Sequence, residues 1–493
     1  MSYVAPRGGA SLPWDGRARG LMRSQAMFFQ RRAGEALADP QLQRNFTGLR
    51  DKFVGMRARA VNAYERDFDE LRDAGQAIRD RVLDNLDVWL ELFEEKATQR
   101  GATVLWAKDG REICEQVVAI AQKHGAKKVI KSKSMLSEEA QLNVALTAAG
   151  VEPVETDLGE YILQLSGNEP PSHILAPAAH KNLDEVADLF AEKHGKPRKS
   201  EIQALTREAR EALREHFLSA DMGLSGGNFL IAETGSVALV TNEGNGRMVT
   251  TLPKVHVVIT GIEKIVPTLE DFATLMRLLP RSATGQEISN YVSVCTGTKG
   301  VDDSDGPEHT YFILVDNGRA GLVGSEFQPM LRCIRCGACM NHCPVYQSIG
   351  GHAYGWVYPG PMGSVLTSLY TGLENSLDLP HAATLCNQCG VVCPVRIPLP
   401  ELLRKLREKQ TECGLRPWPE RLALSMWAWI AQRPGLYSLA TKIGVRYLNW
   451  LAGGEDRIKV LGLAPEWTAG RDFPAPQGRT FKELYKQGQE RKT

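Results

Sequence analysis

The chain of 493 residues lacks several features that would assign it to a functional class directly. It has no run of 18 or more apolar residues, so no segment is expected to span a bilayer as a helix. Nothing at its amino end resembles a secretory signal, which makes a disulfide framework unlikely. A formal net charge of +1 gives no basic excess for nucleic acid. No Gly-x-Gly-x-x-Gly fingerprint stands at a strand–helix junction, so a dinucleotide site is not supported.

Cysteine is also scarce, with 10 residues in all, but most of them gather in one place. Two segments, CIRCGACMNHCP and CNQCGVVCP, contain Cys333, Cys336, Cys339, Cys343, Cys386, Cys389 and Cys393. Thiolates suit iron–sulfur clusters, and a C-x2-C-x2-C run presents three sulfurs to one cluster, while the cysteine before a proline reaches the other. Structural zinc is an alternative, but two Cys-Pro endings and the odd number of cysteines in these segments argue against it. Thiols kept for clusters imply a reducing compartment, hence the cytoplasm. The spacing predicts two iron–sulfur clusters, [4Fe–4S] in type, and hence electron transfer.

The last cysteine of each segment is expected to bind the cluster of the other segment, and this exchange assigns the ligands. Cluster 1 takes Cys333, Cys336, Cys339 and Cys393, and cluster 2 takes Cys343, Cys386 and Cys389. The second segment is a full motif without its first cysteine, because Ala383 stands where that ligand belongs. Three explanations stay open: a [3Fe–4S] cluster, an iron open to water, a partner subunit or a substrate oxygen, and a remote ligand, for which the candidates are Cys413, Cys295 and His381.

Pattern and composition divide the chain into four parts. Residues 1–100 form a helical N-terminal region with apolar positions at helical spacing, and residues 101–325 alternate short strands with helices. This alternation predicts an α/β domain with a largely parallel sheet. Residues 326–400 hold the two clusters, and residues 401–493 form a helical C-terminal region with a polar, mobile tail. The predicted strands are residues 103–107, 127–132, 151–157, 173–178, 229–235, 237–242 and 254–262.

The cysteine segments are far apart in sequence, which bears on the type of cluster module. Residues 344–385 separate them, more than a small β-α-β ferredoxin needs, and they include the helical pattern SVLTSLYTGLENSLDL. An all-helical ferredoxin-like module is therefore predicted. Further on, tryptophans gather between Trp418 and Trp450. They predict a helical cap on a neighbouring domain or subunit, with peripheral contact to the inner face of the membrane as the alternative.

The densest polar signal outside the cysteines lies between Gly223 and Lys264. Glycine-rich loops let the backbone approach an anion closely. Asn228, Asn245 and Arg247 are therefore predicted to bind an anionic ligand, with Arg247 as a bidentate clamp. Sharp turns between packed strands are the alternative.

A second polar segment, KSKSMLSEE, follows a predicted strand and begins a predicted helix. Ser134 is expected to cap this helix, and Lys131 or Lys133 to meet an anion. A capped and solvated helix start is the favoured alternative.

These segments together carry a resemblance. KSKSMLSEE, VETDLGEYILQLSGNEPPSHILAPAAHK and GNFLIAETGSVALVTNEGNGR resemble the domain shared by bacterial lactate-utilization proteins. The two cysteine segments and the DFPAPQGRTFKELY tail are similar to those of the lactate-utilization protein B family, the iron–sulfur members. The resemblance implies a subunit that works with other lactate-utilization subunits to oxidise L-lactate to pyruvate. It also implies a sugar-isomerase and CoA-transferase-like fold for the α/β domain, and three ligands for the second cluster.

Two functions follow as hypotheses. In the first, the protein is the electron-transfer subunit of an L-lactate dehydrogenase complex, because lactate releases two electrons and each cluster carries one; the electron acceptor is not identified by the sequence. In the alternative, the α/β domain is itself a ligand-binding or CoA-transferase-like domain with Glu233 as nucleophile, and the clusters are accessory or structural.

Overall fold

The computed structural model describes residues 24–462, 465–468 and 470–490. Its contacts divide the chain into two compact units, Met1–Cys413 and Gly414–Thr493, each of which is described by itself. The start of the predicted N-terminal helical region and the last three residues of the predicted tail lie outside the described residues.

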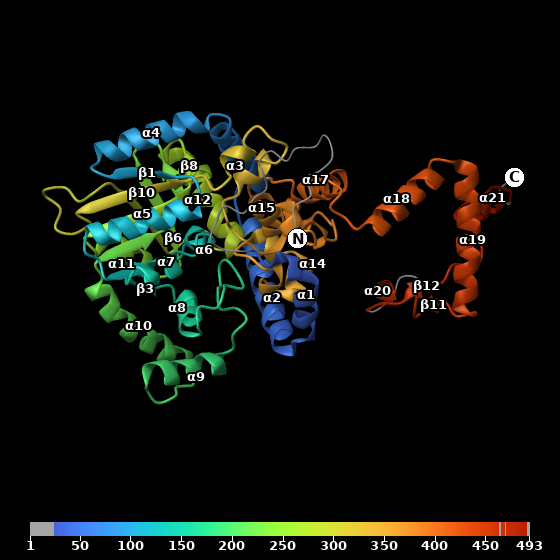
Figure 1. Ribbon diagram of the computed structural model, residues 1–493, viewed down its shortest axis with the longest axis horizontal. Helices are drawn as coiled ribbons and strands as arrows, with labels where there is room; N and C mark the ends of the chain where they lie inside the picture. The colour runs from blue at the N-terminus through green and yellow to red at the C-terminus, as the bar shows by residue number, and fades with distance from the viewer. Residues whose placement is uncertain (1–23, 463–464, 469, 491–493) are drawn as a thin grey trace. The chain divides into compact units, whose positions relative to one another are not determined.

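The first unit is built on a sheet of six parallel strands in the order β1-β10-β7-β4-β2-β3 (Figure 1). The strands are β1 (Thr103–Ala107), β2 (Lys128–Lys131), β3 (Glu152–Glu155), β4 (Met222–Ser225), β7 (Val255–Gly261) and β10 (His309–Val315). Val257 packs on one face of the sheet and Val258 on the other, because successive side chains of a strand alternate. Both faces are covered, as is usual for parallel sheets. The predicted parallel α/β domain is confirmed.

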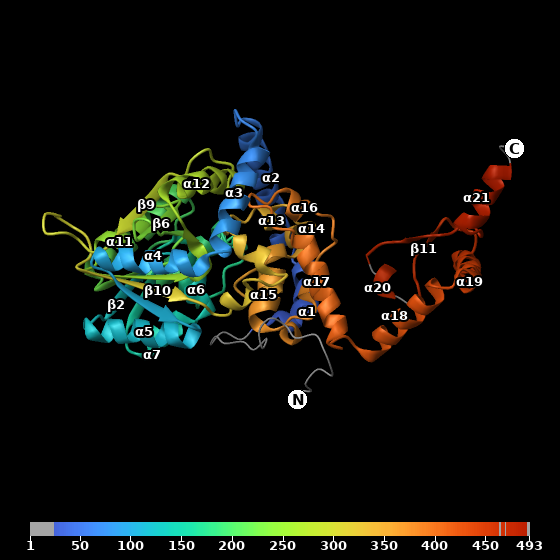
Figure 2. The same ribbon diagram turned by 90° about the horizontal axis from the view of Figure 1, so that it is seen from above.

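Helices cover both faces of this sheet (Figure 2). They are α4 (Leu86–Gln99), α5 (Gly110–Lys123), α7 (Leu142–Ala148), α8 (Leu158–Leu165), α9 (Leu183–His194) and α10 (Ile202–Ser219). Helices α5 and α7 bury Ile113 and Leu142 against one face, and α4 buries Phe93 against the other. Aspartates define where helices start: Asp109 accepts hydrogen bonds from two backbone N–H groups, both at 3.0 Å, at the first turn of α5.

A smaller mixed sheet, in the order β8-β5-β6-β9, packs together with α4 on the same face of the main sheet. Its strands are β5 (Phe229–Ile231), β6 (Ser236–Thr241), β8 (Ile265–Val266) and β9 (Tyr291–Thr296). The remaining helices of the domain are α6 (Met135–Glu139), α11 (Asn245–Thr251) and α12 (Leu269–Ala283).

The predicted strand at residues 173–178 is wrong, because these residues form turns. His173 Nδ1 accepts hydrogen bonds from the backbone N–H groups of Leu175 and Ala176, at 3.0 and 3.2 Å. These bonds occupy the donors that a sheet would need. The predicted strands also leave out β4, β8, β9 and β10, of which β10 lies between β1 and β7.

The cluster module follows the α/β domain and contains no strand between residues 316 and 413, all of which are described. Its helices are α13 (Ala338–Asn341), α14 (Pro344–Ile349), α15 (Gly360–Thr371), α16 (Gln388–Val391) and α17 (Leu399–Glu412). Every residue of α15 is buried, so this helix forms the centre of the module. The predicted helical module is confirmed, and α17 extends it past the expected boundary at residue 400.

The N-terminal helices belong to the same compact body as the cluster module. They are α1 (Phe29–Ala38), α2 (Pro40–Asn62) and α3 (Phe68–Leu83). Helices α1 and α2 pack against α14, and α3 packs against the 3-10 turn Gln328–Arg332 and against α12 (Figure 2). Segments from both ends of the first unit therefore surround the cysteines.

The second unit consists mainly of helices: α18 (Trp418–Ala431), α19 (Pro434–Ala452), α20 (Pro465–Thr468) and α21 (Phe481–Glu490), with the short strands β11 (Arg457–Ile458) and β12 (Phe473–Pro474). None of the α18 side chains is buried, and its three tryptophans are exposed. The segment expected to be a tail contains α21. Across the described ranges, no helix combines the length and apolar character that crossing a membrane requires.

Candidate functional site

Four of the cysteines line one cavity, which we call the first cysteine cavity. They are Cys333, Cys336, Cys339 and Cys393, the set expected for cluster 1. Burial, and after it the neighbouring Cys393, raises the pKa of Cys336 to about 12. Buried thiols so close together ionise only with a cation among them, and a metal cluster supplies that charge. The donor set therefore fits an iron–sulfur cluster.

Basic side chains hold the loops around this cavity. Arg57 donates a hydrogen bond of 3.0 Å to the carbonyl oxygen of Val392, and Arg72 donates one of 3.0 Å to that of Cys393. Lys264 donates to the carbonyl oxygen of Cys333 at 3.3 Å. Backbone carbonyls of irregular loops need such partners. The same contacts place positive charge around the first cysteine cavity.

The other three cysteines line a second cysteine cavity. Cys343 and Cys389 are buried and Cys386 is exposed, and Ala383 forms part of the same lining. None of the three remote candidates lines it. Cys295 lies on β9, Cys413 follows α17, and the His381 ring nitrogen Nε2 lies 3.1 Å from Gln410 Oε1. The structure therefore brings together three thiols here, with Ala383 beside them.

The two cysteine segments repeat one backbone conformation. Arg335 has φ of +60° and Leu385 has +56°, while Gly337 has +75° and Asn387 has +63°. Each segment then enters a one-turn helix, α13 or α16. Left-handed conformations at two equivalent positions are uncommon outside glycine, so their repetition supports the alignment. This alignment places Ala383 opposite Cys333.

The two cavities are neighbours. Helix α13 packs against α16, and the pKa of Cys339 is raised well above its usual range by burial first and then by thiols that include Cys389 of the second cavity. Within the part of the chain that the structure describes, no three His, Cys, Asp or Glu side chains converge as they would around a single metal ion. The seven thiols line two cavities, four in the first and three in the second.

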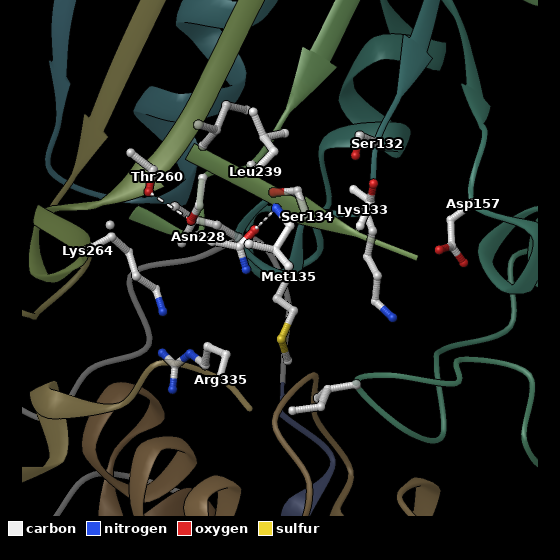
Figure 3. Close-up of a pocket in the computed structure, with 18 of the residues that line it drawn as sticks. Ser132, Lys133, Ser134, Met135, Asp157, Asn228, Leu239, Thr260, Lys264 and Arg335 are labelled. Atoms are coloured by element: carbon white, nitrogen blue, oxygen red, sulfur yellow. Dashed lines mark hydrogen bonds between the residues drawn. The ribbon is translucent and has the colours of Figure 1, made fainter. Parts of the chain in front are cut away.

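A cleft of about 200 Å³ lies beside the first cysteine cavity, at the carboxyl ends of the parallel strands (Figure 3). Ser132 and Lys133 follow β2, Asp157 follows β3, Asn228 follows β4, and Lys264 follows β7. In open α/β sheets, ligands bind at this edge, because loops from several parallel strands meet there. We call this space the sheet-edge cleft.

The cluster module closes the cleft. Arg335 lies between Cys333 and Cys336 and lines both the first cysteine cavity and the sheet-edge cleft. Its guanidinium lies 4.6 Å from the ring centroid of Tyr358, which also lines the cleft. A molecule in the cleft would thus lie against the loop that carries two of the predicted ligands of cluster 1.

The residues predicted to bind an anion are only partly brought together. Asn228 and Asn245 line the cleft, but the exposed Arg247 does not. Lys133 lines the cleft, whereas Lys131 is buried in an ion pair with Glu155.

Two other predicted roles concern a helix cap and a nucleophile. Ser134 caps α6 and accepts a hydrogen bond of 3.3 Å from the N–H of Ser137. Glu233 is exposed in the β5–β6 turn, does not line the cleft, and accepts a hydrogen bond from the N–H of Leu269 at the start of α12. This gives Glu233 a capping partner rather than a place in the cleft.

Three basic residues of the cleft are not among those that the sequence predicts to bind an anion: Lys264, Arg319 and Arg335. Lys264 follows β7 and Arg319 follows β10, and a basic residue just after a strand is the sequence signal that could have indicated both. For Arg319 this signal is absent from the prediction, because β10 is not among the predicted strands. Arg335 was hidden within the cysteine motif. Burial, and after it the nearby Arg335, lowers the pKa of Lys264 to about 7.

Comparison with known proteins agrees with this division of the chain. The family model of the LUD domain matches residues 90–315, that of a 4Fe-4S dicluster domain matches residues 329–397, and that of the lactate utilisation protein B C-terminal region matches residues 404–490. The dicluster match supports the predicted pair of iron–sulfur clusters.

Relatives match nearly the whole chain. Lactate utilization protein B of Lysinibacillus sphaericus is 42% identical over 94% of this chain and 98% of its own length. The protein of the same name from Bacillus pumilus is 42% identical over 95% and 99%. The uncharacterized electron transport protein YkgF of Escherichia coli is 41% identical over 94% and 98%. A solved DUF162 family protein from Deinococcus radiodurans is 17% identical, covers 47% of this chain and 98% of its own, and has a TM-score of only 0.26.

Identity above 40% over more than nine-tenths of both chains decides the assignment. The chain belongs to the lactate utilization protein B family.

Proposed function

We propose that the protein is the iron–sulfur electron-transfer subunit of a multi-subunit system that oxidises L-lactate to pyruvate in the cytoplasm. The observation that carries the proposal is the pair of adjoining cysteine cavities within one helical module. The names of the relatives, which include both lactate utilization and electron transport, support it.

The ligand sets follow from the cavities. We assign Cys333, Cys336, Cys339 and Cys393 to cluster 1. We assign Cys343, Cys386 and Cys389 to cluster 2. When bound, each cluster accepts or gives up one electron at a time.

The side chains around the cavities have separate tasks. Arg57 and Arg72 hold the Val392–Cys393 backbone in place, and Lys264 holds that of Cys333. The apolar side chains of Ile334 and Ile397 line the first cavity and exclude water from it. At the second cavity, Cys386 stays exposed, so a partner can approach.

The oxidation of lactate to pyruvate releases two electrons and two protons. The proposal assigns to this chain the passage of the electrons, and to the other subunits of the system the site that accepts them from lactate or delivers them onward. The exposed tryptophans of α18 suit contact with such a subunit, with a membrane surface as the alternative.

The test uses the protein assembled with its partner subunits and kept anaerobic. Addition of L-lactate should produce the EPR signal of reduced clusters, whereas D-lactate at the same concentration should not. Replacement of Cys336 by alanine should abolish the signal of cluster 1 under the same conditions. Cluster signals that L-lactate leaves unchanged would contradict electron transfer and favour a structural role for the clusters.

A further inference from the structure

The sheet-edge cleft has a floor of buried charges that neutralise one another. Arg319 Nη2 lies 2.8 Å from Glu139 Oε1, and Arg319 Nε lies 2.9 Å from Glu263 Oε2. Glu263 Oε1 in turn lies 3.7 Å from Arg335 Nη2. Gly261 makes room for this chain of charges, because a Cβ there would lie 2.1 Å from Glu263 Oε2. Two carboxylates and two guanidinium groups thus form a balanced, fixed floor.

Two lysines above this floor lack a close, ionised carboxylate as partner. No carboxylate of the described residues lies within ion-pair distance of Lys264 Nζ. Lys133 Nζ is 3.9 Å from Glu160 Oε1, at the limit of an ion pair. Burial, and after it the neighbouring Glu138, raises the pKa of Glu160 well above its usual range, which favours its neutral form. Figure 3 shows both lysines extending from the sheet edge toward the cluster module, on either side of Met135.

Neutral polar groups of the cleft also lack partners. The buried Ser132 lines the cleft, and its hydroxyl makes no hydrogen bond within the described part of the chain. Asn245 is 5% exposed, and its Oδ1 atom has no partner, although its Nδ2 donates to Thr156 at 3.2 Å. Buried polar groups without partners are uncommon, and a ligand can satisfy them. Lysines without an ionised partner, beside a hydroxyl and an amide oxygen that lack hydrogen-bond partners, are suited to bind a small, polar anion.

We propose that the sheet-edge cleft binds a small carboxylate of the 2-hydroxy or 2-oxo acid class. The carboxylate group would lie among Lys133, Lys264 and Arg335, and the hydroxyl or oxo oxygen would reach the Ser132 side. The cations alone specify an anion; the choice of this acid class rests on the proposed function. Because Arg335 also lines the first cysteine cavity, the bound acid lies next to the loop of cluster 1.

A different account of the cations is that they only balance the negative charge of cluster 1. Lys133 separates the two accounts, because it lies on the sheet side of the cleft and does not line the first cysteine cavity. Lys254 is a matched control: its side chain is 77% exposed and paired with Glu308, and it immediately precedes β7, at the opposite edge of the sheet.

The experiment is calorimetric titration of the anaerobic, cluster-containing protein with L-lactate and pyruvate, and with acetate and inorganic phosphate as comparison anions. We expect lactate or pyruvate to bind at least ten-fold more tightly than acetate or phosphate. Lys133→Met should weaken this binding at least ten-fold and Ser132→Ala at least three-fold, while Lys254→Met should change it less than two-fold. The EPR spectrum of each variant shows whether its clusters are intact.

The outcomes separate the site from the proposed function. No binding, or equal binding by Lys133→Met and Lys254→Met, would overturn the site and leave charge balance for the cluster as the role of the cations. Preference for phosphate would overturn the acid class. Specific binding of lactate or pyruvate without any reduction of clusters in the assembled complex would support the site and sink the proposed function instead.

Discussion

The two cysteine cavities share a backbone conformation but differ in their surroundings. Four thiols line the first, which lies between the α/β domain and the N-terminal helices. The side chains of Arg57, Arg72 and Lys264 donate hydrogen bonds to its loops. Three thiols line the second, where Cys386 is exposed. At the equivalent position of the two segments, Arg335 faces the sheet-edge cleft, whereas Leu385 is 39% exposed.

This difference suits the two cavities to different roles. Positive charge near a cluster favours its reduced, more negative state, and burial excludes the solvent that would screen that charge. The first cavity is therefore suited to hold a reduced cluster inside the first unit, beside the sheet-edge cleft. The second, with fewer ligands and an exposed edge, is suited to exchange them with another protein.

The largest expected effect comes from the removal of a ligand. Cys336→Ala and Cys386→Ala should each lose one cluster, because neither cavity has a spare thiol in its lining. Iron analysis and EPR of the anaerobically purified variants should show loss of about half the iron and of one of two signals. Cys295→Ala, on β9, is the control and should keep both clusters; loss of cluster 2 in this control would identify Cys295 as its fourth ligand.

Ala383→Cys tests the difference in ligand number. If Ala383 stands where the fourth thiolate belongs, the new cysteine should close cluster 2. Mild oxidation of the unaltered protein should give the EPR signal of a three-iron cluster, since an iron without a thiolate is the easiest to lose. In Ala383→Cys this signal should disappear and the iron count should rise to that of two four-iron clusters. An unchanged three-iron signal would show that the two segments are not equivalent at this position.

The sequence predicts the cysteine cavities better than the cleft, because the cavities depend on local spacing and the cleft depends on tertiary contacts. The spacing of Cys333 to Cys393 predicts which cysteines line each cavity, because a loop of fixed length can reach only certain corners of a cluster. The cleft was predicted only through Lys133, Asn228 and Asn245. Its other cations are brought there by tertiary contacts: Arg319 by β10, which was not recognised, and Arg335 by the docking of a cluster loop on the sheet edge. Arg247, which is predicted to bind the same anion, lies on the exposed side of α11 and does not line the cleft.

A smaller effect should follow from the arginines beside each cavity. Arg57 donates to a carbonyl next to Cys393, and Arg407 donates to the carbonyl of Ala383 at 3.1 Å. Arg57→Gln should lower the midpoint potential of cluster 1 by about 50 mV, or roughly 1 kcal/mol for one electron, since a positive charge stabilises the reduced state. Arg407→Gln should lower that of cluster 2 instead. An EPR-monitored redox titration distinguishes the two, and equal shifts of both clusters in either variant would contradict separate environments.

The smallest effect should come from glycine at the two equivalent left-handed positions. Leu385→Gly removes about 1 kcal/mol of left-handed strain but costs about 0.5–1 kcal/mol in backbone entropy, so the thermal midpoint should change by no more than about 2 °C. Arg335→Gly removes the same strain but also the contacts with Glu263 and Tyr358, and it should lower the midpoint by several degrees. Circular dichroism of the anaerobic, cluster-containing variants measures both. If Leu385→Gly lowers the midpoint as much as Arg335→Gly, then Leu385 is held by contacts of its own, and the exposed edge of the second cavity is as fixed as the cleft side of the first.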